Sequence, residues 1–335
     1  MNILVLAGGY SPERDVSLAS GCLIANALMK NGWNVALADV FEGADPDKAS
    51  FLAPGSREYA YRVPEKEPDL DALRRAHPGR ALIGPGILEL AARADVVFMA
   101  LHGGMGENGQ LQATLDSFGI RYTGSGYEAS MLAMNKGLTK RLLEAEGIPT
   151  PRGILTQSVP DCISFPCFVK PVSGGSSIGT SRADDREELE KAVREAQRYG
   201  HTVLVEEMVK GREFSVGVLE DRALPPIEII PLEGFYDYKR KYQSGLTREI
   251  CPADLTAGQT QAAQEAALRV SKALGLRDYA RVDFILDEET GEFVCLEANT
   301  LPGMTPTSLL PQMAAAVGIG YEALCRRIVE LALLH

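Results

Sequence analysis

The stretch that decides the fold is residues 279–299, YARVDFILDEETGEFVCLEAN. It contains two runs rich in apolar and β-branched residues, Tyr279–Leu286 and Glu292–Ala298, separated by a Thr290-Gly291 turn. Two such runs joined by a short glycine-containing turn predict an antiparallel hairpin.

Four polar side chains fall on this hairpin in a regular pattern. Side chains two residues apart on a strand share a face, which groups Arg281 with Asp283 and Glu297 with Asn299. Antiparallel pairing can then bring Asp283, Glu297 and Asn299 together. Two carboxylates with one amide oxygen form a site suited to Mg²⁺ that also coordinates nucleotide phosphates. A solvated face is the competing interpretation, which the adjacent arginine and the following Gly-Met turn disfavour.

The rest of the C-terminal part extends this hairpin into an antiparallel sheet. We expect further strands at Glu213–Leu219 and Pro226–Ile230. Helices at Thr256–Leu274 and Tyr321–Leu334 would cover one face of the sheet.

The N-terminal part instead predicts a parallel sheet. Strands alternate there with helices, the pattern of a sheet covered on both faces. The expected strands are Asn2–Ala7, Val35–Val40 and Asp95–Leu101, and the expected helices are Ser17–Lys30 and Gln110–Phe118. Residues 41–80 show no clean period and are expected to form a surface excursion.

The middle of the chain predicts a third unit. Glu128–Glu146 is expected to be one helix, ended by Gly147 and the prolines that follow. Strands are expected at Phe165–Pro171, from Thr180 and at Thr202–Met208, with a charged helix over Asp184–Tyr199. The fold class is therefore α/β and α+β, and the predicted domains are 1–126, 127–210 and 211–335.

Composition narrows the class of protein. The 335 residues carry a formal net charge of -11, are 45% hydrophobic and include six cysteines without a C-x-x-C pair. These values exclude disorder, collagen and a disulfide-rich miniprotein. A net acidic chain is a poor ligand for nucleic acid or anionic membranes, and no apolar run approaches the length of a membrane span. With no signal-peptide pattern either, we expect a cytoplasmic protein.

A first glycine loop allows two interpretations. Gly104–Gly109 matches G-x-G-x-x-G after a strand and before a helix, and Glu128 lies at the distance of a ribose-binding acid. A nicotinamide site is one interpretation, and a tight strand-to-helix turn is the other.

A second glycine loop follows Lys170. Gly174 and Gly179 have the spacing of a phosphate-binding P-loop, but Thr180 stands where that motif needs lysine. A Gly/Ser loop beside Lys170 can still cradle an anion with its backbone N–H groups. The alternative is a surface hairpin turn.

Nine segments, in this order, resemble the motifs of D-alanine–D-alanine ligases, an ATP-grasp family. They are GGYSPERDVS, LHGGMGENGQLQ, YTGSG, FVKPVSGGSSIG, VEEMVKGREFSV, FYDYKRKY, CPA, ARVDF and LEANTLPGMTPTSL. The resemblance spans nearly the whole chain except residues 41–90. It implies an N-terminal α/β domain and two ATP-grasp domains that clasp the nucleotide. It also implies ATP-dependent joining of two D-alanines through a D-alanyl phosphate for peptidoglycan precursor synthesis, two Mg²⁺ or Mn²⁺ ions, and a homodimer.

The resemblance also implies which residues bind ATP and metal. The phosphates would contact Lys136 and Lys170, with Lys241 joining when its loop, Glu233–Thr247, closes as a lid. Adenine and ribose would contact Glu206, the backbone from Glu207 to Val209, and Glu213. The metal ions would bind to Asp283, Glu297 and Asn299.

The amino-acid site is implied in the same way. Glu13 would bind the ammonium of the first D-alanine within a Glu13–Ser176–Tyr242 hydrogen-bond network, and His102 would line that pocket. Arg281 and the Gly303 N–H would stabilise the oxyanion. Ser308 and the Leu309 N–H would receive the carboxylate of the second substrate.

Two other classes stay open beside a ligase. A nicotinamide-dependent oxidoreductase would use Gly104–Gly109 but leaves Lys170 and Arg281 without a role. A nucleotide-binding regulator without catalytic activity would not need to keep all of the expected catalytic residues. The segment Glu206-Glu207 departs from relatives with lysine second, which affects nucleotide affinity and not the chemistry.

Overall fold

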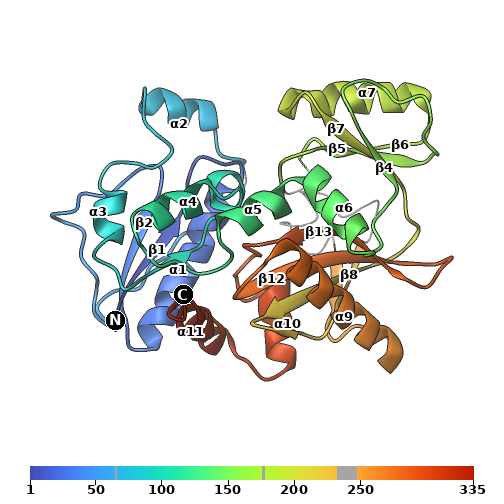
Figure 1. Cartoon of the computed structure of the whole chain (residues 1–335). Coiled ribbons are helices and arrows are strands. Elements are labelled where there is room, and N and C mark those ends of the chain that lie inside the picture. The colour runs from blue at the N-terminus through green and yellow to red at the C-terminus, as the bar shows by residue number, and fades with distance from the viewer. Residues whose placement is uncertain (65, 176–177, 232–246) are drawn as a thin grey trace.

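The computed structural model of the chain describes residues 1–64, 66–175, 178–231 and 247–335. It has three sheets that follow one another along the sequence: one parallel sheet, then two antiparallel ones (Figure 1). This is the expected mixture of α/β and α+β architecture. The domain boundaries at residues 126 and 210 stay a prediction.

The parallel sheet has the order β2-β1-β3. Its strands are β1 (Asn2–Ala7), β2 (Asn34–Asp39) and β3 (Val96–Met99), with η1 (Gly104–Gly106) and the helices α1 (Arg14–Lys30) and α4 (Gln110–Ser117) around them. Ile3–Ala7 and Val96–Met99 are buried, as near-continuous apolar runs require in a sheet covered on both faces. The predicted parallel sheet is confirmed.

Residues 41–90 lie largely on the surface, as predicted for residues 41–80, although Phe41 and Ile87 near the two ends of this stretch are fully buried. Its helices are α2 (Leu70–Ala76), none of whose residues is buried, and the short α3 (Ile87–Ala91). Most residues between 53 and 82 are exposed.

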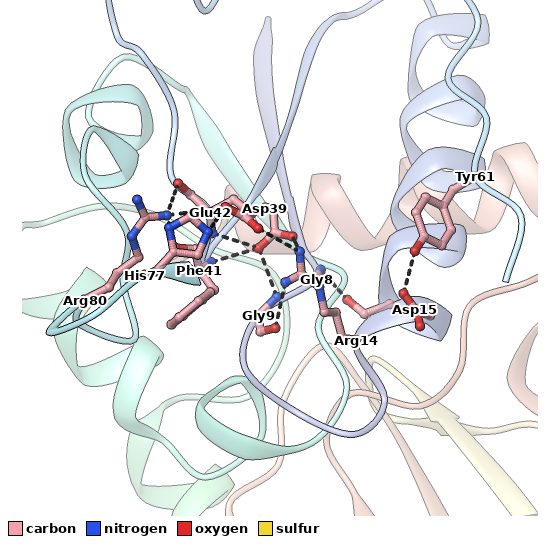
Figure 2. A network of polar contacts seen from close by, with 11 residues as sticks. Gly8, Gly9, Arg14, Asp15, Asp39, Phe41, Glu42, Tyr61, His77 and Arg80 are labelled. Carbon is pink, nitrogen blue, oxygen red and sulfur yellow. Dashed lines mark hydrogen bonds and ion pairs between the residues drawn. The ribbon is translucent and has the colours of Figure 1, made fainter. Parts of the chain in front are cut away.

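A network of polar contacts ties this excursion to the carboxyl end of β1 and β2 (Figure 2). Asp39 accepts hydrogen bonds from the N–H groups of Gly9, Phe41 and Glu42 at 3.2, 2.9 and 3.2 Å, and its carboxylate lies 2.5 Å from the Arg14 guanidinium. Glu42 in turn binds His77 at 2.8 Å. Asp39 therefore holds the ends of two strands and one buried cation together.

Replacing Asp39 with alanine should destabilise the chain strongly. The Asp39 and Arg14 side chains are both only 12% exposed, so the variant leaves a buried guanidinium and three N–H groups without this acceptor. Breaking such a pair costs about 3 kcal/mol in the free energy of unfolding, measured by urea denaturation. Glu187→Ala breaks an exposed pair with Lys191 and should cost less than about 0.5 kcal/mol. Equal effects of the two variants would contradict this assignment.

The helix expected over residues 128–146 is two helices, α5 (Tyr127–Met134) and α6 (Lys136–Ala145). Asn135 separates them with an extended backbone, φ -92° and ψ 95°, and its side chain accepts a hydrogen bond from the Leu138 N–H at 3.0 Å. The prediction of one helix is wrong because asparagine is a strong N-cap, and the apolar period continues across the break. The break places Lys136 at the first position of α6.

The central sheet has the order β4-β7-β5-β6 and is covered by α7. Its elements are β4 (Gly153–Thr156), β5 (Cys167–Pro171), β6 (Ser181–Ala183), α7 (Arg186–Ala196), η2 (Gln197–Tyr199) and β7 (Val203–Glu207). Strand β4 was not predicted. The second glycine loop connects β5 to β6, so it is the connection of an antiparallel hairpin.

The third sheet has the order β11-β10-β8-β12-β13, with β9 paired to β8. Its elements are β8 (Gly211–Leu219), β9 (Arg222–Ala223), β10 (Ile227–Pro231), β11 (Thr247–Ile250), α9 (Ala257–Leu274), β12 (Tyr279–Asp287), β13 (Phe293–Asn299) and α10 (Leu309–Ala316). The hairpin of residues 279–299 is confirmed, and Asp283 pairs with Glu297 while Arg281 pairs with Asn299. The predicted sharing of one face is therefore correct.

The last helix, α11 (Tyr321–Ala332), does not cover this sheet as expected. It packs on α1 and β3 of the N-terminal unit, where Leu324 and Ile328 join the core around Leu28 (Figure 1). Its apolar stripe is complementary to the outer face of α1, and periodicity alone does not say which surface a helix covers. Within the described ranges, no helix is both long and apolar enough to cross a membrane.

Candidate active site

Two cavities meet in the region where the three sheets come together. One has a volume of about 330 Å³ and the other of about 600 Å³. Lys136, Gly174, Gly175 and Glu297 line both of them. A molecule in one cavity would therefore meet a molecule in the other beside Lys136 and Glu297.

The smaller cavity lies between the N-terminal unit and the third sheet. It is lined by the residues that the sequence assigned to the amino acids and the oxyanion: Glu13, His102, Arg281, Gly303, Ser308 and Leu309. Asn299 lines it as well. The structure brings all of these together from four separate stretches of the chain.

The larger cavity lies between the central and third sheets. It is lined by the residues that the sequence assigned to the nucleotide, Lys170, Glu206, Glu207, Val209 and Glu213, and by Asp283. Three more candidates, Ser176, Lys241 and Tyr242, and the lid predicted over Glu233–Thr247 except for Thr247, lie outside the described residues.

Two buried glutamates, Glu13 and Glu107, lie close to Gly175 in the second glycine loop. A Cβ atom at Gly175 would lie 3.7 Å from a carboxylate oxygen of Glu107 and 3.7 Å from one of Glu13. Burial raises the pKa of Glu107 to about 8, and the negative charge of Glu13 adds to the shift. The raised pKa favours the protonated form of Glu107, which can donate a hydrogen bond into the smaller cavity.

The raised pKa of Glu107 predicts a pH-dependent stability. The pKa of Glu107 rises from 4.5 to about 8 on folding, so folding takes up a proton between these two pH values. The contribution of Glu107 to stability is therefore complete below pH 4.5 and is lost as the pH rises through about 8. Relative to Glu107→Gln, the wild-type free energy of unfolding should fall by up to about 1.4 kcal/mol per pH unit between about pH 5 and pH 8. Urea denaturation across that range measures it. Parallel curves for wild type and Glu107→Gln would contradict the assignment.

His102 is a neutral wall of the smaller cavity. Its Nε2 lies 3.3 Å from the Ser20 hydroxyl. Burial lowers the pKa of His102 and outweighs the attraction of Glu13. A neutral imidazole beside an ammonium site adds no positive charge that would repel the ligand.

Arg281 and Asp283 form a two-armed ion pair on β12. The two hydrogen bonds measure 2.8 and 2.7 Å, and Ser215 on β8 donates a third to Asp283 at 2.5 Å. Both side chains of the pair are nearly buried, 12% and 9% exposed. Arg281 is thereby held with its guanidinium at the wall of the smaller cavity.

The predicted metal ligands fit a cation that is bound mainly through a nucleotide. One oxygen of Asp283 accepts from both Ser215 and Arg281, while the other accepts one hydrogen bond from Arg281 and retains lone-pair capacity. Glu297 is 33% exposed at the junction of the cavities. The part of the chain that the structure covers has no group of three or more His, Cys, Asp and Glu able to hold a metal. Mg²⁺ commonly uses one or two carboxylates and completes its shell with phosphate and water.

Ser308 begins α10 at the wall of the smaller cavity. Its hydroxyl lies 2.8 Å from that of Thr305 and accepts from the Thr305 N–H at 3.1 Å. A Cβ atom at Gly303 would lie 2.8 Å from the Ser308 oxygen, so this turn is closed tightly on the hydroxyl. The free N–H groups at the start of a helix attract carboxylates, which is the role expected for Leu309 N–H.

Two of the three glycines in Gly104–Gly109 are required by packing. A Cβ atom at Gly106 would lie 2.4 Å from that of Leu101, and one at Gly109 would lie 2.5 Å from the Tyr127 carbonyl oxygen. The tight strand-to-helix turn is therefore the interpretation that the structure supports.

Two residues at the site were not predicted. Glu107 stood inside the glycine motif, where only the glycines were considered. Lys140 lies four residues after Lys136 on α6, a spacing that places both on one helix face. Its ammonium group lies 2.8 Å from the buried Glu206 carboxylate. Helical spacing from a candidate lysine was the signal that could have found it.

Comparison with known proteins agrees with this geometry. The protein-family model described as "D-ala D-ala ligase N-terminus" matches residues 2–125. The family model described as "D-ala D-ala ligase C-terminus" matches residues 142–330. A D-alanine–D-alanine ligase of Pediococcus pentosaceus is 42% identical, over 98% of this chain and 97% of its own. One of Oleidesulfovibrio alaskensis is 41% identical, over 99% and 97%.

Solved structures give the same result. The crystal structure of a D-alanine–D-alanine ligase from Bacillus anthracis complexed with ATP aligns with a TM-score of 0.77 at 30% identity, covering 100% of this chain and 97% of that one. A second structure of a Bacillus anthracis D-alanine–D-alanine ligase aligns with a TM-score of 0.76 at 32% identity. The oxidoreductase alternative is thus set aside. The sequence motifs, the paired cavities and the full-length similarity together place this chain in the D-alanine–D-alanine ligase family of ATP-dependent ligases.

Proposed function

We propose that this chain joins two D-alanines into D-alanyl-D-alanine, with ATP converted to ADP and phosphate, as a step toward peptidoglycan. The observation that carries the proposal is the junction of the two cavities at Lys136 and Glu297. A nucleotide in the larger cavity can present its terminal phosphate there to a carboxylate in the smaller one.

The nucleotide cavity supplies charge neutralisation for phosphoryl transfer. Lys170 lines it, and Lys136 stands at the junction, where its ammonium donates to the Gly174 carbonyl at 2.6 Å and lies 3.8 Å from Glu297. Transfer to a carboxylate depends on positioning and on stabilising charge more than on covalent help. Asp283, Glu297 and Asn299 would hold Mg²⁺ or Mn²⁺, expected as two ions, which would neutralise charge on the transferred phosphate.

The amino-acid cavity then suits the second half of the reaction. Glu13 would bind the ammonium of the first D-alanine, since a buried ammonium needs a carboxylate partner. The start of α10 at Ser308 and Leu309 would receive the carboxylate of the second D-alanine. Its amine attacks the D-alanyl phosphate, phosphate leaves, and the negative charge on the carbonyl oxygen would be stabilised by Arg281 and the Gly303 N–H.

Five parts of the hypothesis concern residues or states that the structure does not describe. The Ser176 and Tyr242 hydrogen bonds to Glu13, and the contact of Lys241 with ATP, stay predictions, as does the lid. So do the homodimer and the cytoplasmic location. For the location, the free state of all six cysteines is a supporting observation.

Phosphate release with ATP, Mg²⁺ and D-alanine tests the proposal. Phosphate and D-alanyl-D-alanine should form in equal amounts, with the dipeptide identified by mass spectrometry. A competition between equal D-alanine and D-lactate at neutral pH should give mostly the dipeptide. Release of phosphate without any joined product, or absence of release, would contradict the proposal.

A further inference from the structure

We propose that Lys140 is a positioning residue for the nucleotide, which neutralises Glu206 so that the positive charge of Lys170 remains available to the phosphates of ATP. This inference rests on the proposed contact between Lys170 and those phosphates. It assigns a role to a lysine that the sequence motifs leave out.

The first support is the arrangement of one carboxylate between two ammonium groups. Glu206 lies on β7 and is only 3% exposed. One of its oxygens lies 2.8 Å from Lys140, and the other lies 2.7 Å from Lys170. The two lysines come from different elements, α6 and β5, so the carboxylate joins a helix to the central sheet.

The second support is that Lys140 is saturated. Besides Glu206 it donates to the Thr150 hydroxyl at 3.1 Å and to the Pro151 carbonyl oxygen. An ammonium group has three donors, so all three are used inside the protein. Lys140 is 6% exposed.

The third support is the position of each lysine relative to the nucleotide cavity. Lys170 and Glu206 line that cavity, whereas Lys140 lines neither of the two cavities as the described residues define them. Lys140 therefore reaches the nucleotide cavity through the two cavity-lining groups that it binds, the Glu206 carboxylate and the Pro151 carbonyl, and only Glu206 carries a charge.

The charges of Lys140, Glu206 and Lys170 determine the net charge that the nucleotide meets at the cavity wall. One carboxylate with two ammonium groups leaves one positive charge, and Lys170 carries it at the cavity wall. Without Lys140, Lys170 and Glu206 would form a neutral pair, and Lys170 would be held on the carboxylate. Water screens little at this buried position, so the lost charge should be felt strongly by a phosphate. Burial alone would lower the pKa of Lys170, but the charge and hydrogen bond of Glu206, together with the charges of Glu297 and Glu213, outweigh it and raise that pKa.

Lys140→Met tests the inference with two ligands, ATP and adenosine, that share the nucleoside and differ in the charged triphosphate. The KM for ATP should rise by at least about tenfold, the loss of one charge-assisted contact, while the inhibition constant of adenosine changes little. A merely structural role for Lys140 would weaken ATP and adenosine together. Lys140→Arg keeps the positive charge and should retain most of the ATP affinity. Lys191→Met, at an exposed lysine of α7, is the matched control and should change neither constant.

A double variant gives the sharper test, and it also covers the case in which Lys140→Met is unstable. Lys140→Met with Glu206→Gln removes the carboxylate together with its partner and frees Lys170 again. The ratio of ATP affinity to adenosine affinity should therefore return toward the wild-type value in the double variant, although Lys140→Met and Glu206→Gln each disturb the site. Comparing the ratio cancels any contact of Glu206 with adenine. A double variant with a ratio as low as that of Lys140→Met would overturn the inference.

Lys170→Met separates this inference from the proposed function. It should weaken ATP and leave adenosine binding nearly unchanged. If Lys170→Met has no effect on the ATP constant, the proposed phosphate contact is wrong. If Lys170→Met acts on ATP but Lys140→Met does not, the phosphate contact stands and only the role of Lys140 is refuted.

Discussion

Replacing Glu297 with glutamine is expected to lower kcat by about 10³-fold, because metal-ion stabilisation of the transferred phosphate contributes several kcal/mol and each 1.4 kcal/mol is a factor of ten. Glutamine has the shape of glutamate but not its charge, so the variant should keep the fold. Glu297 lies at the junction of both cavities, where it pairs with Asp283 across the hairpin. No other residue of the predicted metal set lines both cavities.

Two measurements distinguish loss of metal from loss of structure. The affinity of the enzyme–ATP complex for Mn²⁺, followed by calorimetry, should fall together with kcat, while thermal unfolding without ligands stays close to wild type. Glu292→Gln, at an exposed position just before the same strand, should behave like wild type in both. Wild-type kcat for Glu297→Gln at saturating Mg²⁺ would show that the metal assignment is wrong.

Replacing Arg281 with methionine is expected to lower kcat by about 10²–10³-fold, the usual loss when one donor to a developing oxyanion is removed. The same change leaves the nearly buried Asp283 carboxylate without its two-armed partner. Breaking a buried pair from one side should also cost about 3 kcal/mol in the free energy of unfolding. Steady-state rates of dipeptide formation and urea denaturation measure the two effects.

Arg281→Lys separates these two effects. Lysine keeps a positive charge beside Asp283 but not the rigid fork of the guanidinium, so stability should recover more than kcat does. Arg327 lies on the distant helix α11 and pairs with Glu220 near the surface, so Arg327→Met should alter neither rate nor stability by much. An Arg281→Met variant that keeps wild-type kcat would remove this residue from the oxyanion site.

The sequence alone was sufficient for the decisive hairpin and for the family. Alternation with period two along Tyr279–Asp287 and Phe293–Asn299, with a glycine turn between them, determines which side chains share a face. The observed pairing of Asp283 with Glu297 also depends on a register shift after Asp283, since Phe284 pairs with Cys295, and the alternation does not contain that shift. The buried runs of the parallel sheet were equally readable, because strands covered on both faces must be apolar throughout.

The helix break at Asn135 and the placement of α11 were decided by the tertiary structure. The apolar period continues across residues 127–145, and only the capping geometry of Asn135 ends one helix and starts the next. The stripe of α11 fits either the third sheet or α1, and the choice depends on which surface remains uncovered. Neither outcome is contained in a local pattern.

The electrostatics of the site also required three dimensions. The raised pKa of Glu107 comes from burial beside Glu13, about ninety residues away in the sequence. Lys140 and Lys170 meet on opposite oxygens of Glu206 because α6, β5 and β7 converge there. The sequence identifies residue types that are capable of a given reaction, because it determines which side chains are present. Which charges become buried together is determined only by packing, because the free energy of a charge depends on the water and the charges that the fold leaves around it.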